Sequence, residues 1–148
     1  MFKPTRILVP TDMSEHADKA VRQAIEISKQ FNAELLLLHV IRDPIQQCVG
    51  DYCISQELVD QLQAEMQEAA RIGIKNQVAK FSALNDISFT ADVKTGVPYE
   101  EILKEADEKG VELIVISSLG TSGVAKYLIG SVARHVLLGA KCSVLLVR

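Results

Sequence analysis

Residues 35–40 read Leu-Leu-Leu-Leu-His-Val, a nearly continuous apolar run that indicates how the chain folds. A strand with one face in water alternates apolar and polar residues, whereas a parallel strand covered on both faces does not. Residues 6–10, 112–116 and 143–147 form similar short apolar runs, and residues 87–93 alternate as expected of a strand near the sheet edge. The sequence therefore predicts five strands, most of them buried on both faces.

Segments with helical spacing lie between these runs. Ser14 can cap the first helix and Asn32 suits its exit, while Pro98 and Gly110 fit the first turn and the end of a later helix. The predicted helices cover residues 14–31, 56–82, 98–110 and 131–139. The apolar stripe expected on the second of them consists of Leu58, Leu62, Met66, Ala69, Ala70 and Phe81.

Strands and helices thus alternate over the whole chain, which predicts an α/β fold with a parallel sheet and helices on both faces. The length of 148 residues suits a single domain spanning residues 1–148. In such folds the ligand binds outside the carboxyl ends of the strands, where the connections diverge. The crevice is therefore expected where the first and fourth strands end.

Composition argues against several classes of function. The formal charge is −3, from 16 basic and 19 acidic residues, and no basic cluster favours nucleic acid. The apolar runs are too short to span a membrane, and the absence of an apolar leader favours a cytoplasmic location. Cys48, Cys53 and Cys142 imply no disulfide framework, and Cys48 and Cys53 lack a second ligand pair for a metal site.

The most informative stretch is Ser117-x-x-Gly120, nine residues, then Gly130-Ser131. Glycines allow the backbone to approach a phosphate closely, and a helix beginning near Ser131 directs free N–H groups towards an anion. The same residues also fit turn glycines followed by an ordinary capping serine. The segment follows a buried strand directly in the sequence, and this position favours the binding interpretation.

Three further residues lie at predicted strand ends. Asp12 can accept a hydrogen bond from a ribose hydroxyl or cap the first helix, and Val40 can meet an adenine edge with its backbone or simply pack in the core. For His39 a structural role is favoured, because no nucleophile lies at a diagnostic spacing.

No catalytic residue is predicted. The chain lacks the nucleophile elbow, the Walker phosphate loop and the dinucleotide-binding glycine motif. A receiver domain shares the topology but needs a lysine after the fifth strand, where this chain ends. A flavodoxin needs a hydroxyl-rich loop after the first strand, which is also missing.

Residues 7–15, 38–41, the glycine segment and residues 142–148 together resemble the universal stress protein family. The resemblance covers nearly the whole chain with every element in order. It implies strand order 3-2-1-4-5, an adenine-nucleotide alpha hydrolase-like fold, and a homodimer formed through the C-terminal strand. It also implies ATP or AMP as ligand, with magnesium accompanying the phosphates.

The family's nucleotide site can be carried over by position. Pro10, Thr11, Asp12 and Val40 would surround the adenosine. The ribose and phosphates would lie against Gly120, Gly130, Ser131 and Val132. Ser117 stands where the family motif has its first glycine, and its Cβ is expected to narrow backbone freedom and crowd the ribose.

Two functions follow from this resemblance. The first is a stress-response regulatory module that binds ATP or AMP, with at most slow ATP hydrolysis. The alternative is a homodimeric interaction protein that binds no nucleotide.

Overall fold

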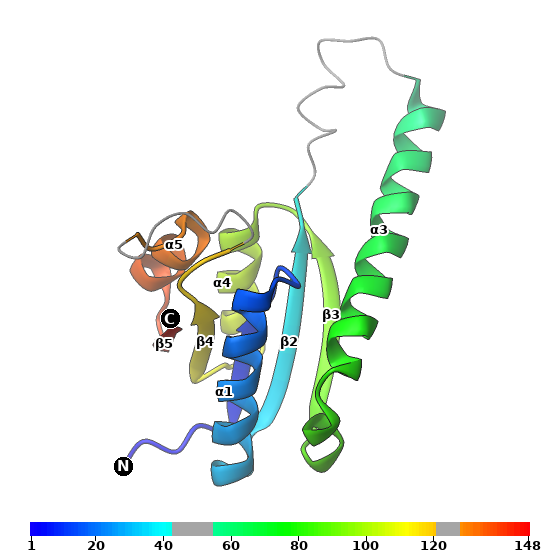
Figure 1. Cartoon of the computed structure of the whole chain (residues 1–148). Helices are drawn as coiled ribbons and strands as arrows, with labels where there is room; N and C mark the ends of the chain where they lie inside the picture. Colours follow the sequence, from blue (N-terminus) through cyan, green and yellow to red (C-terminus); the bar gives the residue numbers. More distant parts are fainter. Residues whose placement is uncertain (43–54, 121–127) are drawn as a thin grey trace.

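A five-stranded, wholly parallel sheet forms the centre of the molecule in this computed structural model, which describes residues 1–42, 55–120 and 128–148 (Figure 1). Its strand order is β3-β2-β1-β4-β5. The strands are β1 (Arg6–Pro10), β2 (Glu34–Ile41), β3 (Phe89–Thr95), β4 (Leu113–Ser117) and β5 (Ser143–Val147). The predicted α/β fold and strand order are therefore confirmed.

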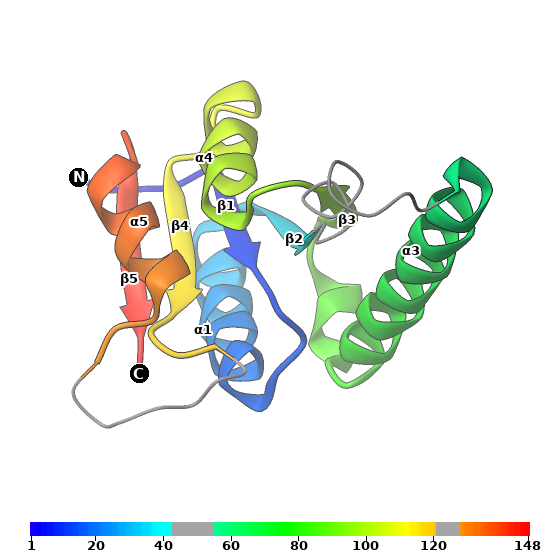
Figure 2. The same cartoon turned by 90° about the horizontal axis from the view of Figure 1, so that it is seen from above.

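Helices cover both faces of this sheet (Figure 2). The α-helices are α1 (Glu15–Phe31), α3 (Gln56–Ala79), α4 (Pro98–Glu108) and α5 (Ser131–Gly139), with a 3-10 helix η1 at Ser82–Asp86. Side chains of α1 and α3 pack on one face, and side chains of α4 and α5 pack on the other. Because successive strand residues point to opposite faces, each central strand supplies both cores.

The two cores show why the central strands are apolar throughout. Ile7 and Val9 of β1 face α1, whereas Leu8 between them faces the side of α4 and α5. In β2, Leu35 and Leu37 join the first core and Leu36 and Leu38 the second. The run at residues 35–40 therefore lacks alternation because it is covered twice, as the sequence predicts.

The helix ends follow local chemistry. The Ser14 hydroxyl accepts a hydrogen bond of 3.2 Å from the Ala17 N–H and caps α1. Asn32 closes the same helix with a left-handed φ of 56°. Pro98 stands in the first turn of α4, and Gly110, with φ of 62°, follows the end of that helix. All four predicted boundary residues are confirmed.

The apolar stripe predicted for α3 is only partly correct: Ala70 is buried and Phe81 packs against the core, but Ala69 is exposed. Leu58 and Leu62 are exposed, because the N-terminal part of α3 extends beyond the ends of the neighbouring strands (Figure 1). The residues that α3 buries are Val59, Ala70, Ile74 and Gln77. The helix also ends at Ala79 and not at the predicted Ser82, because the 3-10 helix η1 begins at Ser82.

The loop predicted at residues 43–55 lies outside the described residues except for Ser55, the N-cap of α3. Cys48 and Cys53 lie in the same undescribed segment. Among the helices of the described residues, none combines the length and apolar character that crossing a bilayer requires.

Candidate functional site

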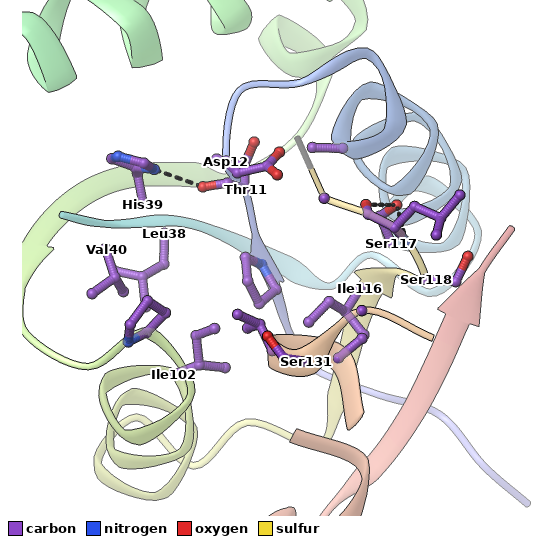
Figure 3. Close-up of a pocket in the computed structure, with 18 of the residues that line it drawn as sticks. Thr11, Asp12, Leu38, His39, Val40, Ile102, Ile116, Ser117, Ser118 and Ser131 are labelled. Carbon is purple, nitrogen blue, oxygen red and sulfur yellow. Dashed lines mark hydrogen bonds between the residues drawn. The ribbon is translucent and has the colours of Figure 1, made fainter. Parts of the chain in front are cut away.

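A cavity of about 510 Å³ opens at the carboxyl ends of β1, β2 and β4 (Figure 3). The connection from β1 leads through α1 to β2 on one side, while β4 lies on the other side of β1. This is the topological switch point at which parallel α/β proteins bind ligands. The predicted location of the crevice, between the ends of the first and fourth strands, agrees with this cavity.

All nine residues predicted for the site line this one cavity: Pro10, Thr11, Asp12, Val40, Ser117, Gly120, Gly130, Ser131 and Val132. They come from three strand ends and from the start of α5, so the fold brings together segments as far apart as residues 10 and 132. The structure brings these residues together, and a binding experiment tests whether they contact a ligand.

Asp12 has one carboxylate oxygen held and the other directed across the cavity mouth. Its Oδ1 accepts hydrogen bonds from the Ser14 backbone N–H at 3.0 Å and from the Ser14 hydroxyl at 2.5 Å. Its Oδ2 lies so near Gly120 that a Cβ placed there would be 3.0 Å away. Asp12 therefore supports the helix cap and still presents an acceptor to the cavity, so the two roles considered for it are compatible.

Gly130 lies at a close backbone approach, where a Cβ would be tight. A Cβ at this position would lie 3.3 Å from the Ser118 carbonyl oxygen and 3.8 Å from the Gly120 nitrogen. The Gly130 N–H donates a hydrogen bond of 2.7 Å to that same Ser118 carbonyl. Because φ at Gly130 is −58°, the glycine is explained by space and not by an unusual dihedral angle.

Ser117 differs from what the sequence led us to expect. Among described non-glycine residues only Met13 and Asn32 have positive φ, so the backbone at Ser117 makes no demand for glycine. Its hydroxyl donates to the Leu119 carbonyl at 2.7 Å and accepts from the Leu119 N–H at 3.3 Å. The serine therefore shapes the turn leading to Gly120 without backbone strain, and crowding of a ribose by its Cβ stays a prediction.

The start of α5 supplies the donors of the site. Gly130 is the N-cap and has no side chain to offer, and the first-turn N–H groups of any helix lack intrahelical partners. Ser131 and Val132 of this turn line the cavity. The helix dipole adds positive potential at the same place, which favours an anionic ligand.

Ten further residues line the cavity but are not in the predicted site, although His39, Ser118 and Leu119 lie at strand ends where the crevice was expected. The ten are Ala17, Leu38, His39, Arg42, Pro98, Ile102, Ile116, Ser118, Leu119 and Ala133. Leu38, Ile102, Ile116 and Ala133 also belong to the core between the sheet and helices α4 and α5. In the sequence these four show only core periodicity, and nothing in that pattern marks Ile102 of α4 as a neighbour of a ligand.

Arg42 and Asp12 are the charged residues among the described lining, with Arg42 exposed just after β2. The His39 Nδ1–H donates a hydrogen bond of 2.7 Å to the Thr11 carbonyl, drawn in Figure 3. This contact fits the structural role predicted for His39. Within the described residues no group of three His, Cys, Asp or Glu side chains is arranged to hold a metal ion.

Fold and cavity together define a parallel α/β protein with a switch-point crevice, a glycine-containing loop and a helix N-terminus facing it. The family model described as "Universal stress protein family" matches residues 3–148. The chain belongs to the universal stress protein family.

Relatives match over almost their full length. The universal stress protein YxiE of Bacillus subtilis is 32% identical over 146 residues, covering 97% of this chain and 98% of the relative. The universal stress protein MJ0577 of Methanocaldococcus jannaschii is 30% identical, covering 100% and 96% of the two chains. A solved structure of MJ0577 has a TM-score of 0.81 at 29% identity, with 99% and 96% covered.

Two more distant structures share the fold and hold nucleotides. A universal stress protein in complex with cAMP has a TM-score of 0.72 at 22% identity, covering 99% of this chain and 98% of its own. A family protein from Arabidopsis thaliana with AMP bound has a TM-score of 0.63 at 20% identity, with 97% and 91% covered. Some universal stress protein structures therefore contain adenine nucleotides.

Proposed function

We propose that this protein binds an adenine nucleotide, ATP or AMP, in the switch-point cavity and acts as a regulatory module in the stress response. The observation that carries the proposal is that the nine site residues predicted from the sequence and its family resemblance all line one cavity of about 510 Å³. That volume lies in the range typical of small-molecule sites.

The base and ribose fit the β2 side of the cavity. Leu38, Val40 and Ile102 offer an apolar slot for a flat ring, and the backbone of Val40 can read its polar edge. Asp12 lies next to this slot and accepts hydrogen bonds from the ribose hydroxyls through Oδ2. A purine nucleoside therefore has both a stacking surface and a polar anchor.

The phosphates fit the β4 side. Ser131 and Val132 of the first turn of α5 line the cavity there, and the N–H groups at a helix N-terminus suit an anion. A protein with net charge −3 needs such local positive potential to hold a polyanion. Magnesium would accompany ATP through its phosphates, because Asp12, the carboxylate of the described lining, is assigned to the ribose.

Universal stress protein structures with cAMP and with AMP support this choice of ligand class. Both are below 25% identity, so they support the proposal only through the shared fold. The remaining support for the proposal comes from the residues of this chain that line the cavity.

Two measurements test the proposal. Ligand released from freshly purified protein is expected to contain ATP, ADP or AMP by mass spectrometry, and calorimetry with added ATP is expected to give one saturable site per chain. If no nucleotide is released and millimolar ATP produces no binding heat, nucleotide binding is refuted.

We also propose a homodimer formed through β5, because one observation favours an interaction surface independently of any ligand. β5 is an edge strand with β4 as its partner in the sheet, and Leu138 of the adjacent α5 is 78% exposed. An apolar edge strand is a template for a second chain. If the cavity binds no nucleotide, this surface supports the alternative function of a dimeric interaction protein.

A further inference from the structure

The turn between β1 and α1 carries Thr11 and Asp12 into the cavity, and it is held from outside by α3. Thr11 is only 6% exposed, and its hydroxyl points away from solvent into the protein. The partner of this hydroxyl is Gln77 of α3, which is 2% exposed and does not line the cavity. A buried polar side chain on a helix face needs such a partner, since an unpaired one is costly.

The hydrogen bonds of Gln77 have a definite direction. The Thr11 hydroxyl donates to Gln77 Oε1 at 2.7 Å, and Gln77 Nε2 donates to Asp18 Oδ1 of α1 at 2.9 Å. Because an ionised carboxylate only accepts, the amide orientation of Gln77 is fixed by Asp18. Asp18 is itself paired through Oδ2 with Lys80 at 2.9 Å.

The relay continues into the backbone of the turn. Because the Thr11 hydroxyl donates its hydrogen bond to Gln77, its oxygen can accept a hydrogen bond of 3.0 Å from the Met13 N–H. Met13 has φ of 65°, a left-handed conformation that a non-glycine residue adopts only when its surroundings impose it. The hydroxyl that Gln77 orients thus secures the unusual residue directly after Asp12.

α3 also makes room for Met13. A Cβ on Gly73, one helical turn before Gln77, would lie 2.2 Å from the Met13 sulfur. Residues four apart on a helix lie on the same face, so Gly73 receives the Met13 side chain beside the hydrogen bond that Thr11 donates to Gln77. Glycine inside a helix is unfavourable, which makes its presence at this contact informative.

We propose that Gln77 is a positioning residue for the nucleotide site: through Thr11 and Met13 it fixes the turn that presents Asp12 to the ligand. The inference rests on the proposed function for the ligand and on the hydrogen bonds above for the mechanism. It assigns α3, which contributes no residue to the described lining, a part in nucleotide affinity.

Moving the negative charge from Asp18 to position 77 tests this proposal. Gln77→Glu keeps the acceptor for Thr11 but places a second carboxylate against Asp18, so the side chain is repelled from its position. Asp18→Asn combined with Gln77→Glu restores a donor and an acceptor at that contact and leaves the net charge unchanged. Ile74→Val, at a buried position of α3 in the core, is the matched control for a purely structural loss.

ATP affinity by calorimetry and exchange of the Met13 amide by NMR are the readouts. We expect Gln77→Glu to weaken ATP about ten-fold, the effect of one lost ligand hydrogen bond, and to accelerate Met13 exchange. The double variant is expected to return both to within about two-fold of wild type, and Ile74→Val to change neither. If Gln77→Glu does not fold, Gln77→Met, which removes the acceptor for the Thr11 hydroxyl altogether, is expected to give the same two losses.

An ATP affinity unchanged in the Gln77 variants, a matching loss in Ile74→Val, or no recovery in the double variant would each overturn the inference. If wild type itself binds no ATP, the proposed function fails, and Met13 exchange then decides this inference alone. Faster exchange that the double variant restores supports positioning of the turn, and unchanged exchange overturns it.

Discussion

Replacing Gly130 with valine probes the close contact on which the phosphate loop depends. The added Cβ would stand 3.3 Å from the Ser118 carbonyl, a backbone atom that cannot rotate away, and the two methyl groups beyond it need further space. The φ of −58° and ψ of 153° are accessible to any residue, so the cost to folding comes from crowding. Overpacking of about 1–3 kcal/mol, reduced by about 0.4–1 kcal/mol from a stiffer unfolded chain, leaves a modest net loss of stability.

The effect on ligand binding is expected to be larger. Displacing the loop would deny a phosphate oxygen one or two N–H donors at the start of α5, which costs about 2–4 kcal/mol, or roughly 30- to 700-fold in Kd. Adenosine has no phosphate and should keep its affinity to within about three-fold, less than 1 kcal/mol. Calorimetry with ATP and adenosine on the same preparation gives the comparison.

Gly110→Ala is the matched control. Gly110 has φ of 62° with no atom within 4 Å of an added Cβ, and it precedes β4 at the end opposite the cavity. Alanine there is strained by about 1–2 kcal/mol, a loss of stability comparable to that of Gly130→Val, without touching the site. Equal weakening of ATP and adenosine by Gly130→Val, or loss of ATP binding in Gly110→Ala, would refute the reasoning.

Three further outcomes are expected. Asp12→Ala should weaken ATP and adenosine alike, by about 1–2 kcal/mol in calorimetry, because its contact is with the nucleoside; selective loss of ATP would contradict this. Lys94→Met should lower the free energy of unfolding by about 2 kcal/mol, because it leaves the carboxylate of Glu105, which is only 4% exposed, without its ion pair. The loss is limited because the Lys94 side chain is 26% exposed and its charge is partly screened by water. The hydrogen bond to Glu105 raises the pKa of Lys94, so this contribution is complete below the ordinary lysine pKa of about 10.4 and is lost as the pH rises through the raised value; denaturation at pH 8 and above pH 11 checks the sign. Val144→Lys on β5 should shift light scattering from dimer to monomer at about tens of micromolar protein, and a wild-type monomer at that concentration would contradict the dimer.

The order of elements and the cavity follow from simple features of the sequence. Doubly covered strands such as residues 35–40 have no polar alternation, and the end of each strand marks where side chains meet. The resemblance then assigned Gly120, Gly130 and Ser131 to one site, and they line one cavity. Local signals of this kind are readable because each depends on a few neighbouring residues.

Other features depend on contacts between distant segments. Leu58 and Leu62 have the periodicity of a buried face, yet the sheet beside them ends before they are reached. Gln77 has the opposite property, since a polar residue on a helix is normally read as exposed, but its partners are Thr11 and Asp18 on other elements. The sequence motif has glycine at the position of Ser117, so the serine was expected to be unfavourable. In the structure its backbone has no positive φ, and its hydroxyl stabilises a turn. Periodicity and motif matching do not encode these pairings.

Titration of the labelled wild-type protein with ATP, followed residue by residue in NMR, tests the central claim most directly. Adenine nucleotide in the switch-point cavity is expected to shift the amide signals of Thr11, Val40, Gly120 and Ser131 together, with one saturation curve. Adenosine should reproduce the shifts at Thr11 and Val40 and leave the signal of Ser131 nearly unchanged. Shifts confined to other parts of the chain, or spectra unchanged at millimolar ATP, would contradict the account.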